Sequence, residues 1–352
     1  AGLPEIFESE GYDRTSMKLP QCQDRLIEEV LKVQPNVVVV LHNGSPVELP
    51  WADKVSAILE MYLGGQGVGE ACDWLLYGEA NPSGRLAETF PYRLEDNPSY
   101  LHFPGNGKRV LYGEDIFVGY RYYDTKKVPV RYAFGHGLSY TEFAYEDLNL
   151  SSAQMTDEDI LTVSFKVKNT GKTEGKEVVQ LYVKDCTHSA IRPEKELKGF
   201  EKVFLNPGET KTVTMELDKR SFAWYNTELH DWFAASGEYK LLVGTSSRDI
   251  HLESRIHLNS SQELPMHVHM NTTLGELFRN PKTSETAKEL TAKYISAMNV
   301  GEESSSEAAS EAVTEEMTEA MTDSMPLRAL VSFGGYSREE LTKIIEKLNK
   351  LV

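Results

Sequence analysis

The spacing of apolar residues predicts an α/β architecture for the first part of the chain. Residues 21–34 repeat apolar side chains at helical spacing, and residues 36–41 (NVVVVL) follow as a continuous β-branched run. Such a run is typical of a strand that is buried on both faces of a parallel sheet. Residues 55–63 have the same character. We therefore expect the C-terminal part of a mostly parallel α/β sandwich domain over residues 1–142.

A glycine-rich stretch follows the second expected strand. Residues 64–69 (GGQGVG) open a helix that is expected to continue to Leu76, and Gly78 is a suitable residue for its end. The stretch fits the dinucleotide fingerprint G-x-G-x-x-G poorly, and no ribose-binding acid stands at the expected distance. A tight turn from strand to helix is the better interpretation.

Residues 143–258 change to short alternating segments. Apolar and polar residues alternate over 160–167 and 177–183, and again over 211–217 and 239–243, with turn residues between them. Short alternating strands at regular spacing indicate an antiparallel β-sandwich. We expect an immunoglobulin-like or fibronectin III-like module.

The remaining residues, 259–352, form a helical extension. Residues 271–300 have helical spacing with a break at Pro281, whereas residues 301–325 contain eight acidic residues and no basic ones. Such a stretch buries too little apolar surface to order itself, so we expect a disordered acidic linker there. Ser337 and Glu340 form a capping box for a terminal helix, whose apolar stripe must dock on another element.

The net charge of −17 argues against nucleic acid and against docking on an anionic membrane surface. No apolar run reaches the length of a membrane span, and the first residues lack the features of a signal peptide. Cys22, Cys72 and Cys186 are far apart and lack CxxC spacing, which favours free thiols in a reducing compartment. We expect a cytoplasmic protein with no cofactor or metal.

The most polar segment of the chain is 8–14 (ESEGYDR), directly before the first helix. Glu10 stands beside Gly11 and close to Arg14, and partial burial next to another carboxylate would suit it as a general acid. The alternative is a solvated acidic turn with Arg14 in a surface ion pair. The spacing alone does not decide between them.

Other candidate residues have ordinary explanations. His267 and His269 form a His-x-His without a third ligand, so a solvated connector is expected. His136 is expected to pack in a turn, and Ser45 and Ser83 lack the G-x-S-x-G context of a hydrolase elbow.

The aromatic segment 112–123 has two interpretations that the sequence leaves open. Its tyrosines could form a sugar-stacking platform, or they could pack a domain-linking loop onto the sheet.

Many of these stretches match sequence motifs of one family. They are 8–19 with Gln21, 35–46 (PNVVVVLHNGSP), 63–69, 81–91 (NPSGRLAETFP), 112–124, 132–143 (YAFGHGLSYTEF), 167–171, 175–180, 196–200, 205–209 and 236–239. On these residues, which extend over about 1–258, the chain resembles the C-terminal half of glycoside hydrolase family 3, of the β-glucosidase type with a fibronectin III-like domain.

The resemblance implies a reaction and a site. The family is built from a (β/α)8-type barrel, an α/β sandwich and the fibronectin III-like domain, and it hydrolyses terminal β-D-glucosides with retention. That chemistry needs two carboxylates about 5–5.5 Å apart. The nucleophile is an Asp of the barrel, and the acid/base is a Glu in a segment like Glu-Gly-x-Asp-Arg. The match places the acid/base at Glu10, with Glu8 as second choice and with Asp13 and Arg14 as supporting loop residues.

The chain departs from the full family pattern because it has no barrel, and no Asp in it matches the nucleophile. We expect tight association with the barrel half, as another chain or a preceding segment, because half of a parallel sheet exposes strand edges and apolar faces. The expected substrate is a β-glucoside, and homo-oligomerisation stays open. The alternatives are a non-catalytic carbohydrate-binding or scaffolding subunit and a family 3 β-xylosidase.

Overall fold

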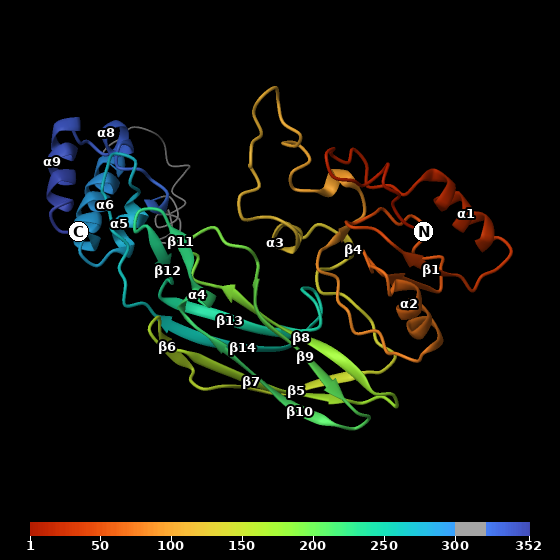
Figure 1. The fold of residues 1–352 in the computed structure, drawn as a ribbon. Helices are drawn as coiled ribbons and strands as arrows, with labels where there is room; N and C mark the ends of the chain where they lie inside the picture. The colour runs from red at the N-terminus through yellow and green to blue at the C-terminus, as the bar shows by residue number, and fades with distance from the viewer. Residues whose placement is uncertain (300–321) are drawn as a thin grey trace, which may run out of the picture. The chain divides into compact units, whose positions relative to one another are not determined.

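The computed structural model of the chain describes residues 1–299 and 322–352. They belong to two compact units (Figure 1). The first unit comprises residues 1–226 and 231–262, and the second comprises residues 227–230 and those described within 263–352.

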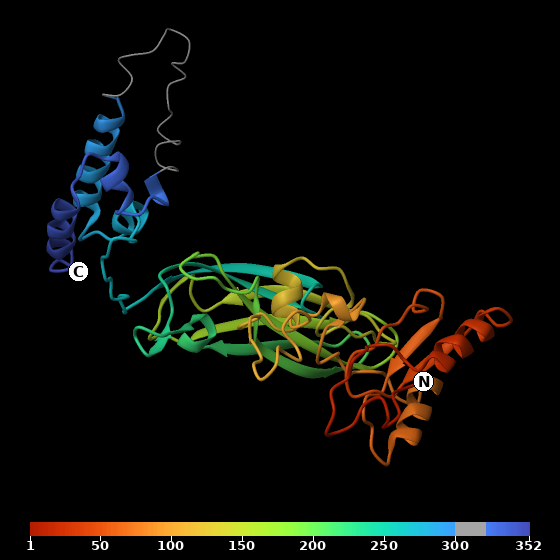
Figure 2. The same cartoon turned by 90° about the horizontal axis from the view of Figure 1, so that it is seen from above.

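The first part of unit one is a small α/β arrangement. Helix α1 (Gln21–Leu31) precedes strand β1 (Val38–Leu41), and strand β2 (Ala57–Glu60) precedes helix α2 (Val68–Tyr77). Strands β1 and β2 pair in parallel, and both helices lie next to them in the two views (Figures 1 and 2). The predicted order of helix, strand, strand and helix is therefore confirmed, with each element a few residues shorter than expected.

The ends of the elements follow from local chemistry. Helix α2 ends at Gly78, which adopts the left-handed conformation with φ of 81°, as expected for a C-cap glycine. At Gly64, an added Cβ would lie 2.4 Å from Val68 Cγ2. The glycines of this stretch thus permit the tight turn from β2 into α2, as the sequence indicated.

The α/β part leaves apolar side chains uncovered within this chain. On α1, Leu26 and Val30 are exposed, and Trp74 and Tyr77 are exposed on α2. The segment before α1 pairs with the end of β1, since Gly2 forms a parallel bridge with His42. The core of this part is instead concentrated around β1 and the residues that follow it: Leu19, Ile27, Val39, Leu41, Val47, Leu49, Trp51, Ala52 and Phe90.

A long excursion connects this part to the next domain. Strand β3 (Phe90–Pro91) pairs with β4 (Val130–Tyr132), and between them lie a 3-10 turn (Leu94–Asp96) and helix α3 (Tyr120–Thr125). The chain from residue 97 to 119 has no helix or strand of its own. Figure 1 shows it standing away from the strands before it returns as α3.

The predicted β-sandwich is present. One sheet has the order β10-β7-β5 and the other β6-β14-β13-β8-β9. In β7 every second side chain is buried, which confirms the alternation read from residues 160–167. The strands are β5 (Phe143–Leu150), β6 (Gln154–Thr156), β7 (Leu161–Asn169), β8 (Gly175–Asp185), β9 (Glu196–Leu205), β10 (Thr210–Leu217), β13 (Gly237–Gly244) and β14 (Ile250–Asn259).

Two smaller elements complete the sandwich. The short helix α4 (Lys219–Phe222) begins at Asp218, whose side chain accepts a hydrogen bond from the Ser221 N–H. It leads into the hairpin of β11 (Trp224–Asn226) and β12 (Asp231–Phe233).

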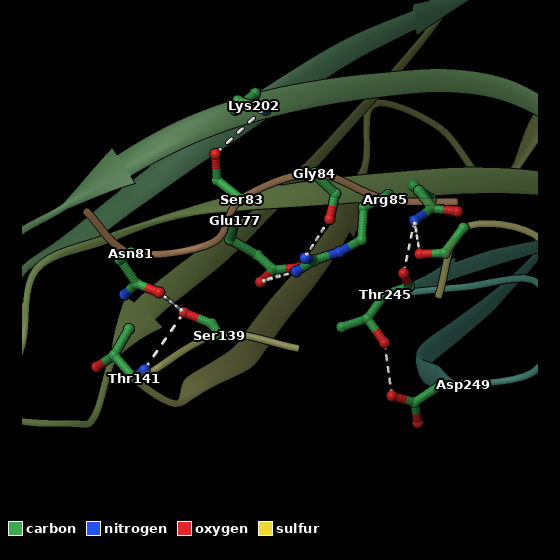
Figure 3. A network of polar contacts seen from close by, with 12 residues as sticks. Asn81, Ser83, Gly84, Arg85, Ser139, Thr141, Glu177, Lys202, Thr245 and Asp249 are labelled. Atoms are coloured by element: carbon green, nitrogen blue, oxygen red, sulfur yellow. Dashed lines mark hydrogen bonds and ion pairs between the residues drawn. The ribbon is translucent and has the colours of Figure 1, made fainter. Parts of the chain in front are cut away.

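Polar contacts join the α/β part to the sandwich. Arg85 forms an ion pair with Glu177 of β8 at 2.7 Å, and both side chains are buried. The other oxygen of Glu177 accepts a hydrogen bond from the Tyr145 hydroxyl at 3.0 Å. Figure 3 shows Arg85 and Glu177 pointing toward one another at the centre of this junction. Nearby, Asn81 donates to the Glu174 carbonyl at 2.9 Å.

Unit two is helical. Its helices are α5 (Leu274–Arg279), α6 (Ser284–Asn299), α8 (Ala329–Phe333) and α9 (Arg338–Leu348). Pro281 separates α5 from α6, as expected, and the capping box of Ser337 and Glu340 is present. The stripe of α9 buries Leu341, Ile345 and Leu348 in a core shared with the other helices.

The predicted acidic linker, 301–325, lies almost wholly outside the described residues. Of its last residues, Asp323 forms an ion pair with Arg279 at 2.8 Å. No helix in the described part of the chain is long and apolar enough to cross a membrane.

Candidate active site

The loop 8–14 is fastened to the carboxyl end of β1 through Glu8. One carboxylate oxygen of Glu8 accepts the Gly44 N–H at 2.6 Å. The other accepts the Ser45 hydroxyl and lies 3.4 Å from a guanidinium nitrogen of Arg14. Gly44 and Ser45 come shortly after β1, at the edge where α/β sheets commonly place functional residues.

Arg14 closes this cluster from the other end of the loop. Its Nη1 also donates to the Ser45 hydroxyl and to the Pro46 carbonyl, the latter at 3.5 Å. A Cβ at position 44 would lie only 3.1–3.3 Å from the Glu8 carboxylate, so glycine there permits the close approach. We call Glu8, Arg14, Gly44 and Ser45 the loop anchor.

Glu10 lies on the part of the loop that the anchor leaves free. Its side chain is exposed, and it forms no hydrogen bond or ion pair with the residues that the structure describes. Asp13 is exposed as well, while Gly11 adopts φ of 95° and allows the chain to turn between them. The exposure of Glu10 and Asp13 agrees with a solvated turn in this chain, and a catalytic role for Glu10 stays a prediction. Arg14 is partly buried rather than a surface ion pair, and no described residue buries Glu10.

Two further glutamates, Glu60 and Glu88, lie close enough to Glu8 for its charge to affect their pKa values. Burial raises the pKa of Glu60 to about 7, and the negative charges of Glu88 and Glu8 add to this. Burial also raises the pKa of Glu88 to about 7, with Glu8 adding to the shift and Arg14 opposing it. Glu60 accepts hydrogen bonds from the Tyr62 N–H at 2.8 Å and from the Asn43 side chain at 3.2 Å.

No sequence pattern singled out Glu60 or Glu88. The available signal was the position of Glu60 near the end of an expected strand, where a carboxylate meets the loops of the carboxyl edge. Their closeness to Glu8 depends on chain segments that are far apart in sequence.

A cavity of about 390 Å³ opens beside the anchor. It is lined by Arg14 and Ser45 of the anchor and by Glu88, Thr89 and Glu114. Glu114 comes from the 97–119 excursion, so the cavity lies between the excursion and the carboxyl edge of the sheet. Tyr123 and several proline and aliphatic side chains form the apolar part of the cavity wall.

In the aromatic segment 112–123, some tyrosines are packed and others are exposed. The Tyr120 ring stacks on Phe134 at 4.6 Å, and its hydroxyl accepts the Leu197 N–H at 2.7 Å. Tyr120 therefore packs the connection onto the sandwich, and Tyr123 is buried as well. Tyr112 is exposed and stays available to a ligand or partner.

The histidines occupy the places expected of them. His136 stacks on Tyr132 at 5.2 Å, and burial lowers its pKa, with the nearby Arg85 lowering it further. The rings of His267 and His269 are 6.4 Å apart. Among the described residues, no group of three or more His, Cys, Asp or Glu side chains is placed to hold a metal ion.

Comparison with known proteins decides the family. Residues 1–140 match the glycosyl hydrolase family 3 C-terminal domain, and residues 177–247 match the fibronectin type III-like domain. The chain belongs to glycoside hydrolase family 3. The fold predicted from the sequence, an α/β part followed by a fibronectin III-like sandwich, is thereby confirmed.

Curated family 3 relatives are longer than this chain. The thermostable beta-glucosidase B of Acetivibrio thermocellus is 50% identical over 353 residues, which cover 100% of this chain and 46% of that protein. The beta-glucosidase of Kluyveromyces marxianus is 47% identical over 251 residues, 71% of this chain and 29% of that one. The chain therefore spans less than half the length of these relatives.

Solved family 3 structures agree with the fold. The GH3 beta-glucosidase of Bifidobacterium adolescentis has a TM-score of 0.75 and 42% identity, over 81% of this chain and 42% of that one. Beta-glucosidase 3B of Thermotoga neapolitana, solved in complex with alpha-D-glucose, has a TM-score of 0.67 and 42% identity, over 71% and 36% of the two chains.

Proposed function

We propose that this chain supplies the general acid/base of a retaining β-glucosidase and that Glu10 is that residue. The observation that carries the proposal is the loop anchor. It engages both oxygens of the Glu8 carboxylate and leaves Glu10 as a free carboxylate on a fastened loop. The family 3 membership of the chain and its beta-glucosidase relatives supply the reaction class.

In this mechanism Glu10 acts twice, first as an acid and then as a base, on two different protons. It first donates a proton to the leaving glycosidic oxygen while the nucleophile forms a bond to the anomeric carbon. It then accepts a proton from water, which displaces the nucleophile and restores both carboxyl groups. The nucleophile must stand about 5–5.5 Å from Glu10 for this to occur with retention.

Glu8 and Arg14 act through Glu10 as positioning residues. Glu8 ties one end of the loop to the residues after β1, and Arg14 ties the other end to the same residues. A general acid works only within hydrogen-bond reach of the atom that it protonates, so the anchor fixes where Glu10 stands. Asp13 is exposed and acts as an organiser of the free part of the loop in the assembled site.

The nucleophile comes from a barrel half that packs against this chain. Two observations support this part of the proposal. The family 3 relatives are more than twice as long as the matched region, and α1 and α2 leave Leu26, Val30 and Tyr77 exposed. Apolar faces of this kind are usually covered in a stable protein.

The test is Glu10→Ala in the enzyme assembled with its barrel half. We expect kcat for ordinary β-glucosides to fall by about 10²–10⁴-fold, the usual contribution of a general acid/base. Azide should restore turnover of an activated aryl glucoside, because it attacks the glycosyl-enzyme without general-base help and yields the β-glucosyl azide.

The matched control is Glu5→Ala, an exposed glutamate of the same segment. It should keep full activity. Near-normal turnover of ordinary glucosides by Glu10→Ala would eliminate Glu10 as the acid/base. Azide rescue in Glu8→Ala instead would transfer the role to Glu8.

A further inference from the structure

A buried asparagine, Asn43, joins the ends of the two parallel strands. It stands two residues after β1 and is 1% exposed. Its Nδ2 donates to the Ser45 carbonyl at 2.9 Å and to a carboxylate oxygen of Glu60, the last residue of β2, at 3.2 Å. The side chain therefore connects Ser45 of the loop anchor to the second strand.

The orientation of this amide is set by its two acceptors. Oδ1 of Asn43 is buried and has no hydrogen-bond partner among the described residues, and a buried acceptor without a partner destabilises a fold. A flipped amide would place Oδ1 against two other oxygens, the Ser45 carbonyl and the Glu60 carboxylate. Native proteins break the rule of satisfied polar groups mainly at functional sites. The unpaired oxygen thus points to a role for the two contacts that Asn43 does make.

Glu60 presents its carboxylate to Asn43 from a constrained turn. One oxygen accepts the Asn43 amide, and the other accepts the Tyr62 N–H at 2.8 Å. Tyr62 has a φ of 48°, a left-handed conformation that bulky residues rarely adopt. Both oxygens of Glu60 are therefore engaged, and its side chain is held in one direction.

Ser45 connects these strand ends to the loop. Its carbonyl accepts from Asn43, whereas its hydroxyl donates to Glu8 and accepts from Arg14. Neither Asn43 nor Glu60 belongs to the residues that line the cavity beside the loop anchor. Their contacts therefore reach the loop through Ser45.

The charge of Glu60 also reaches the loop anchor. Burial, followed by the negative charges of Glu88 and Glu8, raises the pKa of Glu60 to about 7, while its two hydrogen bonds oppose the shift. Because this coupling is mutual, an ionised Glu60 repels the Glu8 carboxylate in the anchor. Arg14 is the opposing positive charge, since it pairs with Glu8 and lowers the pKa of Glu88. A neutral Glu60 therefore supports the anchor better than an ionised one.

We propose that Asn43 and Glu60 are positioning residues for the candidate acid/base, Glu10. Glu60 holds the Asn43 amide, and Asn43 holds Ser45, whose hydroxyl belongs to the loop anchor. A general acid works only within hydrogen-bond reach of the atom that it protonates, so a small shift of the anchor lowers the rate without any change in a substrate contact. The proposal rests on the function proposed above, because it requires Glu10 to transfer the proton.

The first experiment compares two substrates of the assembled enzyme, an alkyl glucoside with a poor leaving group and an activated dinitrophenyl glucoside. Asn43→Ala should lower kcat/KM for the alkyl glucoside about tenfold, the scale of one buried hydrogen bond. It should change kcat/KM for the dinitrophenyl glucoside little, because that leaving group needs no acid. In a Glu10→Ala background, Asn43→Ala should cause no further loss, since a residue that acts through Glu10 is coupled to it. A merely structural residue would lower both substrates alike and in both backgrounds.

The matched controls are Asn36→Ala and Glu79→Ala, whose side chains are exposed, and they should behave as the unaltered enzyme does. If circular dichroism shows that Asn43→Ala does not fold, Glu60→Ala decides in the same assay. Glu60→Gln keeps one acceptor oxygen and should recover part of the loss. Equal losses for the two substrates, or full additivity with Glu10→Ala, overturn this proposal. Undiminished turnover of the alkyl glucoside by Glu10→Ala alone overturns the proposed function instead.

The second experiment measures the pH profile of kcat/KM for the alkyl glucoside. As pH rises through about 7, Glu60 gains its charge and the anchor should loosen, so part of the decline between pH 6 and 8 comes from this residue. Glu60→Gln cannot ionise and should decline less over this interval, whereas Glu79→Gln should follow the unaltered enzyme. Superimposable profiles for all three proteins would overturn the role assigned to the charge of Glu60.

Discussion

Two glutamate–arginine pairs in unit one have opposite surroundings. At the junction of the α/β part and the sandwich, Arg85 and Glu177 are 2.7 Å apart, and their side chains are only 7% and 2% exposed. In the loop anchor, Arg14 and Glu8 are 3.4 Å apart and are 18% and 24% exposed. The first pair joins segments 92 residues apart in sequence, whereas the second joins the two ends of one loop.

The surroundings of each pair decide what it can do. A buried pair cannot exchange its partner for water, so it fixes the position of one domain on the other. A half-buried pair costs less to form and leaves neighbouring groups in reach of solvent. The loop anchor can therefore hold a loop in place while Glu10 stays exposed for a reaction.

The largest effect is expected from breaking the buried pair. Glu177→Ala leaves the Arg85 guanidinium and the Tyr145 hydroxyl buried without their carboxylate. Removal of one partner of a buried pair costs about 3–5 kcal/mol, so the urea midpoint of the sandwich should fall markedly. Glu216→Ala changes an exposed glutamate of β10 and should leave the midpoint unchanged. Equal midpoints for the two variants would contradict the structural role of the junction.

Breaking the loop anchor should affect activity more than stability. In the assembled enzyme, Glu8→Ala frees one end of the loop, and we expect kcat for ordinary glucosides to fall about 10- to 100-fold, because misplacement by an ångström can cost that much. Formation of the glycosyl-enzyme from an activated dinitrophenyl glucoside, which needs no acid, should change little.

A double-mutant cycle tests whether the anchor works as one unit. Ser45→Ala removes a hydroxyl that bonds to both Glu8 and Arg14. Its effect on kcat should not add to that of Glu8→Ala, since contacting residues in one network are coupled. Strict additivity would show that Glu8 does not act through the anchor.

The carboxyl groups near Glu8 predict a pH dependence. The folded pKa of Glu60 is about 7, above its ordinary value of 4.5, so the folded state holds more protons than the unfolded state between these pH values. Stability should therefore fall as pH rises from about 4.5 to 7. Glu60→Gln removes this contribution.

The measurement compares the thermal midpoints of the chain and of Glu60→Gln at pH 5 and pH 8. The fall in the midpoint should be smaller in the variant. The difference between the two proteins is decisive, because burial lowers the pKa of His136 and makes that residue act in the opposite direction. Parallel pH profiles would mean that Glu60 is ionised in the folded chain throughout.

The smallest effect is expected from a pair that is exposed on the same sandwich. Lys184 and Glu194 are 2.5 Å apart, with side chains 32% and 40% exposed. Despite this short distance, Glu194→Gln should cost about 1 kcal/mol or less, because water replaces the lost partner. A loss as large as that of Glu177→Ala would show that distance rather than burial sets the strength of these pairs.

The fold could be read from the sequence wherever a local pattern decides the structure. The alternation over 160–167 and the continuous run over 36–41 each depend on which faces of a strand are buried. Gly78 and the capping box at Ser337 report the chemistry of single helix ends. These features need no knowledge of distant residues, so they were predicted with errors of only a few positions.

The candidate site could be predicted from the sequence only in part. The polarity of the segment Glu8–Arg14 marked it as a candidate without deciding its role, and the resemblance to family 3 pointed to Glu10. The anchoring of Glu8 to Gly44 and Ser45 could not be predicted, because these residues are 36 and 37 positions away along the chain. The cavity with Thr89 and Glu114 likewise needs the 97–119 excursion to return beside the sheet.

The sequence by itself determined the order of the elements, the change from α/β to sandwich and the loop that holds the candidate acid/base. Folding sets which carboxyl groups are buried, as at Glu177, which are partly buried, as at Glu60 and Glu88, and which remain exposed, as at Glu10. The physical reason is that a periodic pattern records the face that a residue occupies. The solvation and partners of a charged group depend instead on segments that only folding brings together.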